Sequence, residues 1–184
     1  MSDSAAPPSP GQALSLSPND TLIVYFSFTG NTEAVARVLH GQTGLPLAAI
    51  ERPQAIVLGL EDDEGPVPQD ITDIDLTPVR TLLLGFPVWA GQLPSGVEAW
   101  LDDTGLADKV ILPFCTHGGD GAGKSFDEVQ QRCPDSTVYP GLALQGGIEE
   151  DGVMLPMEDE QLAEVGIHLA AWLAEQRTSL AHGD

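Results

Sequence analysis

Residues 21–39 constrain the fold more than any other stretch of the chain. Residues 22–26 form an unbroken apolar run rich in β-branched and aromatic side chains, which is typical of a strand buried on both faces. Apolar residues then recur at helical spacing, at Ala34, Val35, Val38 and Leu39. A strand that feeds a helix through the polar loop 27–32 aims backbone N–H groups and the positive helix end at one point, which suits a phosphate. The simpler interpretation of this loop is a helix cap made by Asn31 or Thr32.

Strand and helix patterns alternate along the rest of the chain. Apolar runs predict further strands over residues 45–50, 81–86, 109–114 and 137–144. Helical spacing predicts a first helix that ends near residue 41 or 44, and later helices that start near residue 95 and cover 125–132 and 158–176. Residues 51–79 contain four prolines and an acidic run, which argue against a regular helix. Five strands alternating with helices indicate an α/β fold with a parallel sheet.

The length of 184 residues fits one domain, which we place at residues 21–177. Residues 1–20 are rich in Ser and Pro without periodicity, and we expect a disordered N-terminal tail there. Residues 178–184 are expected to form a flexible C-terminal tail.

Three loops that follow predicted strands have unusual compositions. They cover residues 27–32, 86–94 and 115–123, and the third is rich in glycine. Ligands of open parallel sheets bind beyond the carboxyl ends of the strands. We therefore expect the three loops to meet at one edge of the sheet and to form a binding site.

Each of the three loops resembles a loop of the flavodoxins. Residues 27–32 read Ser-Phe-Thr-Gly-Asn-Thr and match the phosphate-binding pattern Ser/Thr-x-Thr-Gly-Asn-Thr of that family. Residues 85–91, Gly-Phe-Pro-Val-Trp-Ala-Gly, are similar to the Gly-x-Pro-hydrophobic-Trp loop of one branch, and residues 116–121, Thr-His-Gly-Gly-Asp-Gly, to its Thr-His-Gly-Gly-Ser-Gly loop. The resemblance runs from residue 21 to about 147. It implies the flavodoxin-like fold, a doubly wound three-layer sandwich with a five-stranded parallel sheet in the order 2-1-3-4-5.

The resemblance also implies a noncovalent FMN cofactor. Its phosphate would lie on the first loop and its isoalloxazine between the other two, with Trp89 on or near the ring face. The implied cofactor-binding residues are Ser27, Phe28, Thr29, Gly30, Asn31, Thr32, Pro87, Val88, Trp89, Ala90, Gly91, Cys115, Thr116, His117, Gly118, Gly119, Asp120 and Gly121. No catalytic residue and no metal site is predicted.

The third loop departs from the family pattern in two respects. Flavodoxins that only carry electrons often cover the outer flavin face with an aromatic side chain of this loop, but residues 115–123 contain none. The ring could then be open to a substrate. Asp120 stands where this branch often has a small hydroxyl residue, and if it faces the flavin its charge opposes an added negative charge. His117 is expected to bond a backbone group or the cofactor edge.

The charge of the chain restricts its partners. Asp and Glu number 28 against 7 Lys plus Arg, which gives a formal net charge of −21. This balance argues against nucleic-acid binding and against an anionic membrane surface. It fits a basic protein partner, but a solvated acidic surface that serves solubility alone explains it more simply. The sequence has no apolar run long enough to span a membrane, no signal peptide and no cysteine framework, so a cytoplasmic setting is expected. The expected partner is a redox protein or a small-molecule electron acceptor, and any NAD(P)H would dock directly at the flavin.

Two other functions remain open at this point. Residues 118–125 satisfy the P-loop pattern G-x-x-x-x-G-K-S between a strand and a helix, which would make the protein an NTPase using Lys124 and Ser125. No later strand ends in an Asp that could hold Mg²⁺, and the loop at 27–32 would have no role, so we treat the motif as a coincidence. The second alternative is a flavin-free interaction module of the same fold.

Overall fold

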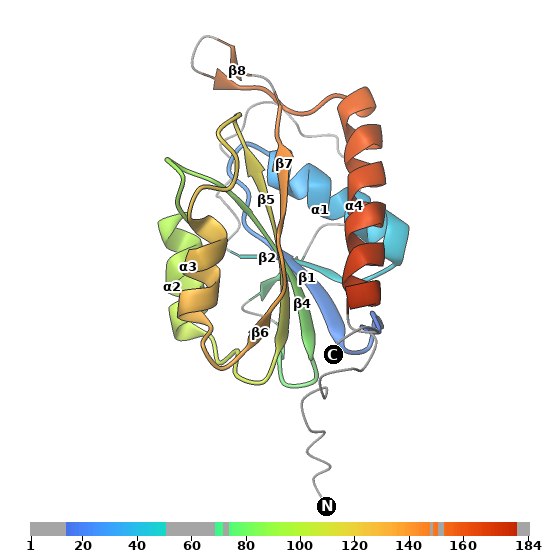
Figure 1. The fold of residues 1–184 in the computed structure, drawn as a ribbon, viewed down its shortest axis with the longest axis vertical. Helices are drawn as coiled ribbons and strands as arrows, with labels where there is room; N and C mark the ends of the chain where they lie inside the picture. Colours follow the sequence, from blue (N-terminus) through green and yellow to red (C-terminus); the bar gives the residue numbers. More distant parts are fainter. Residues whose placement is uncertain (1–13, 51–68, 72–73, 148, 151–152, 180–184) are drawn as a thin grey trace, which may run out of the picture.

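A parallel β-sheet runs through the centre of the computed structural model, which describes residues 14–50, 69–71, 74–147, 149–150 and 153–179 (Figure 1). The strand order is β3-β2-β1-β4-β5-β6, and β7 also pairs with β5. The central strands are β1 (Thr21–Tyr25), β4 (Thr81–Pro87) and β5 (Val110–His117). The outer strands are β2 (Leu47–Ala49) and β3 (Gln69–Asp70) on one side, with β6 (Thr137–Val138) and β7 (Leu142–Gln145) on the other.

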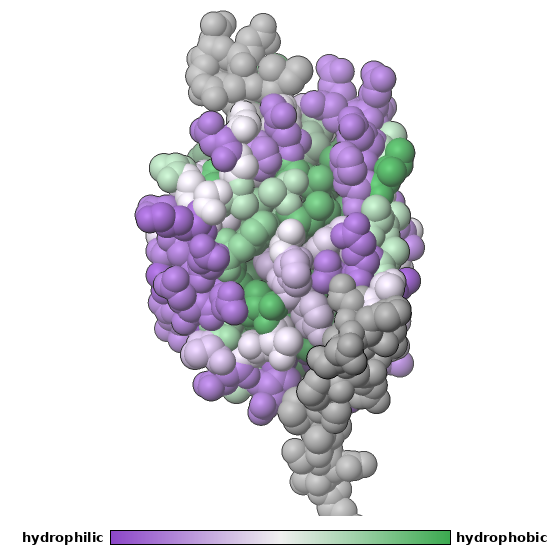
Figure 2. Space-filling model, viewed as in Figure 1, coloured by the Kyte–Doolittle hydropathy of each residue, from purple (hydrophilic) through white to green (hydrophobic). Residues whose placement is uncertain are grey.

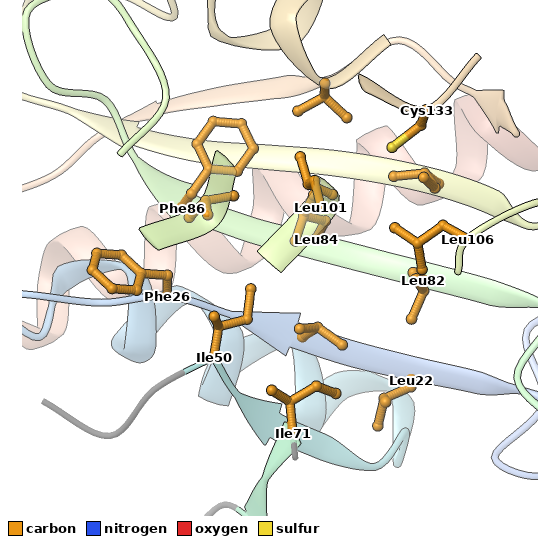
Figure 3. Packing of buried hydrophobic residues seen from close by; sticks show 14 of the residues in the cluster. Leu22, Phe26, Ile50, Ile71, Leu82, Leu84, Phe86, Leu101, Leu106 and Cys133 are labelled. Carbon is orange, nitrogen blue, oxygen red and sulfur yellow. The ribbon is translucent and has the colours of Figure 1, made fainter. Parts of the chain in front are cut away.

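Helices cover both faces of this sheet (Figure 1). One face packs against α1 (Asn31–Thr43) and α4 (Asp159–Ser179), and the other packs against α2 (Ser95–Asp103) and α3 (Ser125–Arg132). Alternate strand residues point to opposite faces, so Leu82 and Leu84 join the α2/α3 side, whereas Leu83 joins the α1/α4 side. Figure 3 shows the cluster on the α2/α3 side, to which β4 contributes Phe86 and α2 contributes Leu101. The sequence pattern of fully apolar strands follows from this burial on both faces.

The predicted α/β architecture and the strand order are confirmed, with two differences in strand count. The predicted last strand, 137–144, is two short strands, β6 and β7, because residues 139–141 interrupt it. Pro140 has no N–H for a ladder bond. Gly141 lies under the ring of Phe126, since a Cβ at this position would be 2.5 Å from Phe126 Cζ. The second difference is the additional edge strand β3, which lies in the stretch 51–79 that gave no clear pattern.

Two further segments complete the described chain. An antiparallel hairpin of β8 (Glu149–Glu150) and β9 (Val153–Met154) separates β7 from α4. Leu14 and Leu16, which belong to the predicted N-terminal tail, pack against the α1/α4 cluster.

The face in Figure 2 carries hydrophobic residues over β5 and β7, with hydrophilic residues on both sides. Among the described residues, no helix is long and apolar enough to cross a membrane.

Candidate cofactor site at the carboxyl edge of the sheet

The structure brings the three predicted loops to one edge of the sheet. They follow β1, β4 and β5, which are neighbouring parallel strands, so their carboxyl ends point the same way. Val88 N–H donates to Thr116 O over 2.8 Å and thereby joins the second loop to the end of β5. Pro87 lies opposite Thr116 in the β4–β5 register. The expected convergence of the loops is therefore present.

The first loop, 27–32, has the features of an anion cradle. Gly30 has a φ of 87° and directly precedes α1, whose first N–H groups have no partner inside the helix. The hydroxyl of Ser27 is buried and has no hydrogen-bond partner among the described residues. An unpaired buried hydroxyl is rare in folded proteins and calls for an explanation such as an absent ligand. Thr29 is exposed on the same loop. These groups fit a phosphate.

The side chains of Asn31 and Thr32 are already engaged with other parts of the fold. Thr32 Oγ1 lies 2.8 Å from Thr116 Oγ1, and either hydroxyl can donate. Asn31 Nδ2 donates to Leu155 O over 3.1 Å, and Asn31 Oδ1 accepts from Met157 N–H over 2.9 Å. These two residues therefore fix the loop to β5 and to the segment before α4. Their backbone N–H groups remain available to an anion.

The second loop presents Trp89 at the base of a tight turn. Trp89 and Gln92 exchange two backbone hydrogen bonds, of 3.1 and 3.0 Å, around Ala90 and Gly91. Both central residues have positive φ, 51° and 75°, as a type I′ turn requires. Trp89 is 43% exposed, and the rings of Phe26 and Phe28 each meet it edge-to-face at a centroid distance of 5.8 Å.

The third loop folds around the imidazole of His117. The N–H groups of Gly119 and Gly121 both donate to His117 Nδ1, over 3.1 and 3.2 Å. An acceptor Nδ1 places the proton of the neutral imidazole on Nε2. Gly118 and Asp120 are exposed in this loop. The expectation that His117 bonds a backbone group is confirmed.

The remaining reactive groups near the site are inert or absent. Cys115 is fully buried, and burial raises the pKa of its thiol to about 12, so it is not a thiolate nucleophile. No group of three or more His, Cys, Asp or Glu residues suited to a metal ion occurs in the described part of the chain. Within the P-loop-like motif, Ser125 is buried and its hydroxyl donates to Ala122 O over 2.7 Å. Ser125 is 0% exposed, whereas a P-loop needs this hydroxyl to be accessible to Mg²⁺.

Comparisons with known proteins agree with this fold. The family model described as flavodoxin matches residues 61–159, which include the second and third loops. The structure is similar to a putative flavoprotein from Bacteroides eggerthii DSM 20697, with a TM-score of 0.57, 20% identity, and coverage of 85% of this chain and 96% of that one. It is also similar to a putative flavoprotein from Bacteroides uniformis ATCC 8492, with a TM-score of 0.55, 23% identity, and coverage of 70% and 91%.

A third similar structure is that of oxidised flavodoxin 2 from Bacillus cereus, with a TM-score of 0.54, 21% identity, and coverage of 85% of this chain and 99% of that one. At these identities the likeness is one of fold. No match was found among curated proteins. The family model spans more than half of the 184 residues, and the sheet has the predicted flavodoxin order. The chain therefore belongs to the flavodoxin family.

Proposed function

We propose that this flavodoxin-family protein binds FMN at the carboxyl edge of the sheet and takes part in electron transfer or in the reduction of a small molecule. The observation that carries the proposal is the buried, unpaired hydroxyl of Ser27 at the end of β1. It lies in a loop that ends at the N-terminus of α1. FMN, when bound, supplies the capacity to accept and release electrons.

The phosphate would be held without a cationic side chain from the loop itself. Ser27 Oγ and the exposed Thr29 hydroxyl can donate to phosphate oxygens, together with the free N–H groups at the start of α1. The helix dipole adds favourable charge at this point. Gly30 adopts the left-handed conformation between the loop and α1, and this turn would direct these donors toward the phosphate.

The ring would lie between the second and third loops. Trp89 is 43% exposed and would offer aromatic surface to the ring, and the loop 118–121 would offer backbone groups. His117 holds a proton at Nε2 because Nδ1 accepts from the loop backbone. The side chain can thus donate a hydrogen bond from the rim of the site. The third loop has no aromatic residue, which supports an open ring and the approach of a small molecule.

The formal charge of −21 favours a basic redox protein as partner over an acidic one. A small-molecule electron acceptor is the other partner class, with NAD(P)H docking directly at the flavin. The cytoplasm, with both cysteines as free thiols, is the setting that we propose.

Titration of the purified protein with FMN and with riboflavin tests the proposal. We expect binding of both, with FMN tighter, because only FMN carries the phosphate. Anaerobic addition of NADH or NADPH then separates a reductase, whose flavin absorbance bleaches, from a carrier that needs a protein donor. Absence of flavin binding would overturn the proposal and favour an interaction module.

A further inference from the structure

Hydrogen bonds join the segment that carries Trp89 to the third loop and to α3. One of these bonds is accepted by the carboxylate of Glu128. We infer that Glu128 is a positioning residue for the flavin ring, because its side chain holds the Trp89 turn in place. This inference rests on the proposed function, since Glu128 would act on the flavin through Trp89. The same contacts also give the P-loop-like motif, residues 118–125, a structural role that does not involve a nucleotide.

The turn is held at three points along its length. Val88 N–H donates to Thr116 O over 2.8 Å, and Lys124 N–H donates to Gly91 O over 2.8 Å. The third bond runs from Leu93 N–H to Glu128 Oε2, also over 2.8 Å. The first two bonds join backbone to backbone. Only the third of them depends on a side chain, so it is the one that a single substitution can remove.

The second loop and the motif also touch through two glycines. A Cβ on Gly123 would lie 2.6 Å from Gly91 Cα and closer still to Gly91 O. Gly123 has a φ of 55°, a conformation that glycine adopts without strain. The glycine and the lysine of the P-loop-like motif therefore serve a backbone junction: Gly123 permits the approach, and Lys124 donates its N–H across it.

Glu128 is well placed to accept the last bond. It lies in the first turn of α3, where the helix dipole favours a carboxylate. Leu93 is buried, at 5% exposure, so its N–H would lack a partner without Glu128. Either a carboxylate or an amide oxygen at this position can accept this hydrogen bond. Losing it would free the segment that follows the turn and let the Trp89 ring change its orientation.

Two substitutions separate the reach of the side chain from its charge. Glu128→Gln keeps an acceptor oxygen at the same distance and removes the charge, whereas Glu128→Asp keeps the charge and shortens the side chain by one methylene. The neighbouring Asp127 is exposed and lies in the same first turn, so Asp127→Asn is the matched control. The readouts are the dissociation constant of FMN and the visible circular dichroism of bound FMN, which reports the asymmetry around the ring.

We expect Glu128→Asp to weaken FMN about tenfold, equivalent to about 1.4 kcal/mol, and to change the circular dichroism of the bound flavin. Glu128→Gln and Asp127→Asn should stay within about twofold of the parent protein and keep its spectrum. If Glu128→Gln changes the spectrum as much as Glu128→Asp does, the charge is what matters and the positioning role is wrong. The role is also wrong if Glu128→Asp has the same FMN dissociation constant and the same circular dichroism of bound FMN as the Asp127→Asn control.

A measurement without flavin distinguishes this inference from the proposed function. Hydrogen exchange of the Leu93 amide in the flavin-free protein should be slow in the parent and in Glu128→Gln, and faster in Glu128→Asp. Equal exchange rates of the Leu93 amide in all three proteins would show that Glu128 does not protect this amide, whether or not FMN binds. Slow exchange in a parent that binds no flavin would instead count against the proposed function alone.

Discussion

Thr32 and Thr116 meet hydroxyl to hydroxyl, 2.8 Å apart and buried, although 84 residues separate them in the chain. The contact joins the start of α1 to the end of β5, and so the first loop to the third. It therefore fixes the position of the first loop relative to the third.

This pair should couple in stability. Thr116→Val leaves the Thr32 hydroxyl buried without a partner and should cost about 1–3 kcal/mol of unfolding free energy. The double variant Thr32→Val/Thr116→Val removes both polar groups and should cost less than the sum of the single variants. Urea unfolding of the four proteins measures this difference. Additive single effects would mean that the two hydroxyls do not interact.

Ser27 should matter to FMN and not to the flavin-free fold. Its hydroxyl has no partner among the described residues, so Ser27→Ala should leave the unfolding free energy unchanged or slightly raised. The same variant should weaken FMN by about 1 kcal/mol, which is a loss of roughly fivefold, and leave riboflavin affinity unchanged. Calorimetric titration with the two ligands checks this. Equal losses for FMN and riboflavin would place Ser27 away from the phosphate.

Trp89 is the aromatic residue that we expect against the ring. Trp89→Ala should brighten the fluorescence of bound FMN, because a stacked indole quenches it, and should weaken binding by roughly 1 kcal/mol. Trp100 lies on α2, packs against the core and is the matched control. Trp100→Phe should leave the fluorescence of bound FMN unchanged. If Trp89→Ala also leaves it unchanged, Trp89 does not face the isoalloxazine.

The fold was predictable because its signals are local. The apolar runs of β1, β4 and β5 indicated strands buried on both faces, and α3 occupies residues 125–132 as predicted. The break between β6 and β7 was also visible as Pro140 followed by Gly141, but the apolar residues around them suggested one strand. Much of the stretch 51–79 lies outside the described residues, including the acidic run at 61–64.

The convergence of the three loops was predictable from the sequence, but the side-chain hydrogen bonds between them were not. The sequence located the three loops, but it did not reveal which groups the Asn31 and Thr32 side chains bond within the fold. Their partners in the structure, Thr116 and the segment 155–157, lie far along the chain, where no local pattern reveals them. The bond from Leu93 N–H to Glu128 was missed for the same reason. Its only local signal was an acidic residue in the first turn of a helix, which helix stability alone explains.

Alkaline pH should destabilise the fold through its buried thiols. Burial raises the pKa of Cys115 from 9.0 to about 12 and that of Cys133 to about 11. The unfolded thiols ionise first, so stability is full below pH 9 and falls as pH rises from 9 towards 12. The loss is up to about 1.4 kcal/mol per pH unit and thiol within each window. Urea unfolding at several pH values should show a shallower decline in Cys115→Ala/Cys133→Ala. Parallel slopes in the two proteins would assign the decline to other groups, such as Tyr139, whose pKa burial also raises.

Asp120 should lower the reduction potential of bound FMN, because full reduction can add negative charge to the flavin and Asp120 is exposed in the loop expected beside the ring. A unit charge about 8 Å away across a water-like dielectric contributes roughly 0.5 kcal/mol, or about 20 mV. Asp120→Asn should therefore raise the potential by an amount of this order, and the shift should shrink as salt is added.

The control for this last prediction is Asp103→Asn. Asp103 is the exposed last residue of α2, a helix that starts directly after the second loop. The length of this helix separates Asp103 from that loop, so salt should screen most of its charge effect there. Spectroelectrochemical titration of both variants at fixed pH compares them directly. A shift confined to Asp120→Asn would mean that local charge sets the potential. Equal shifts would assign the effect to the overall charge of −21, and no shift in either would place Asp120 away from the flavin.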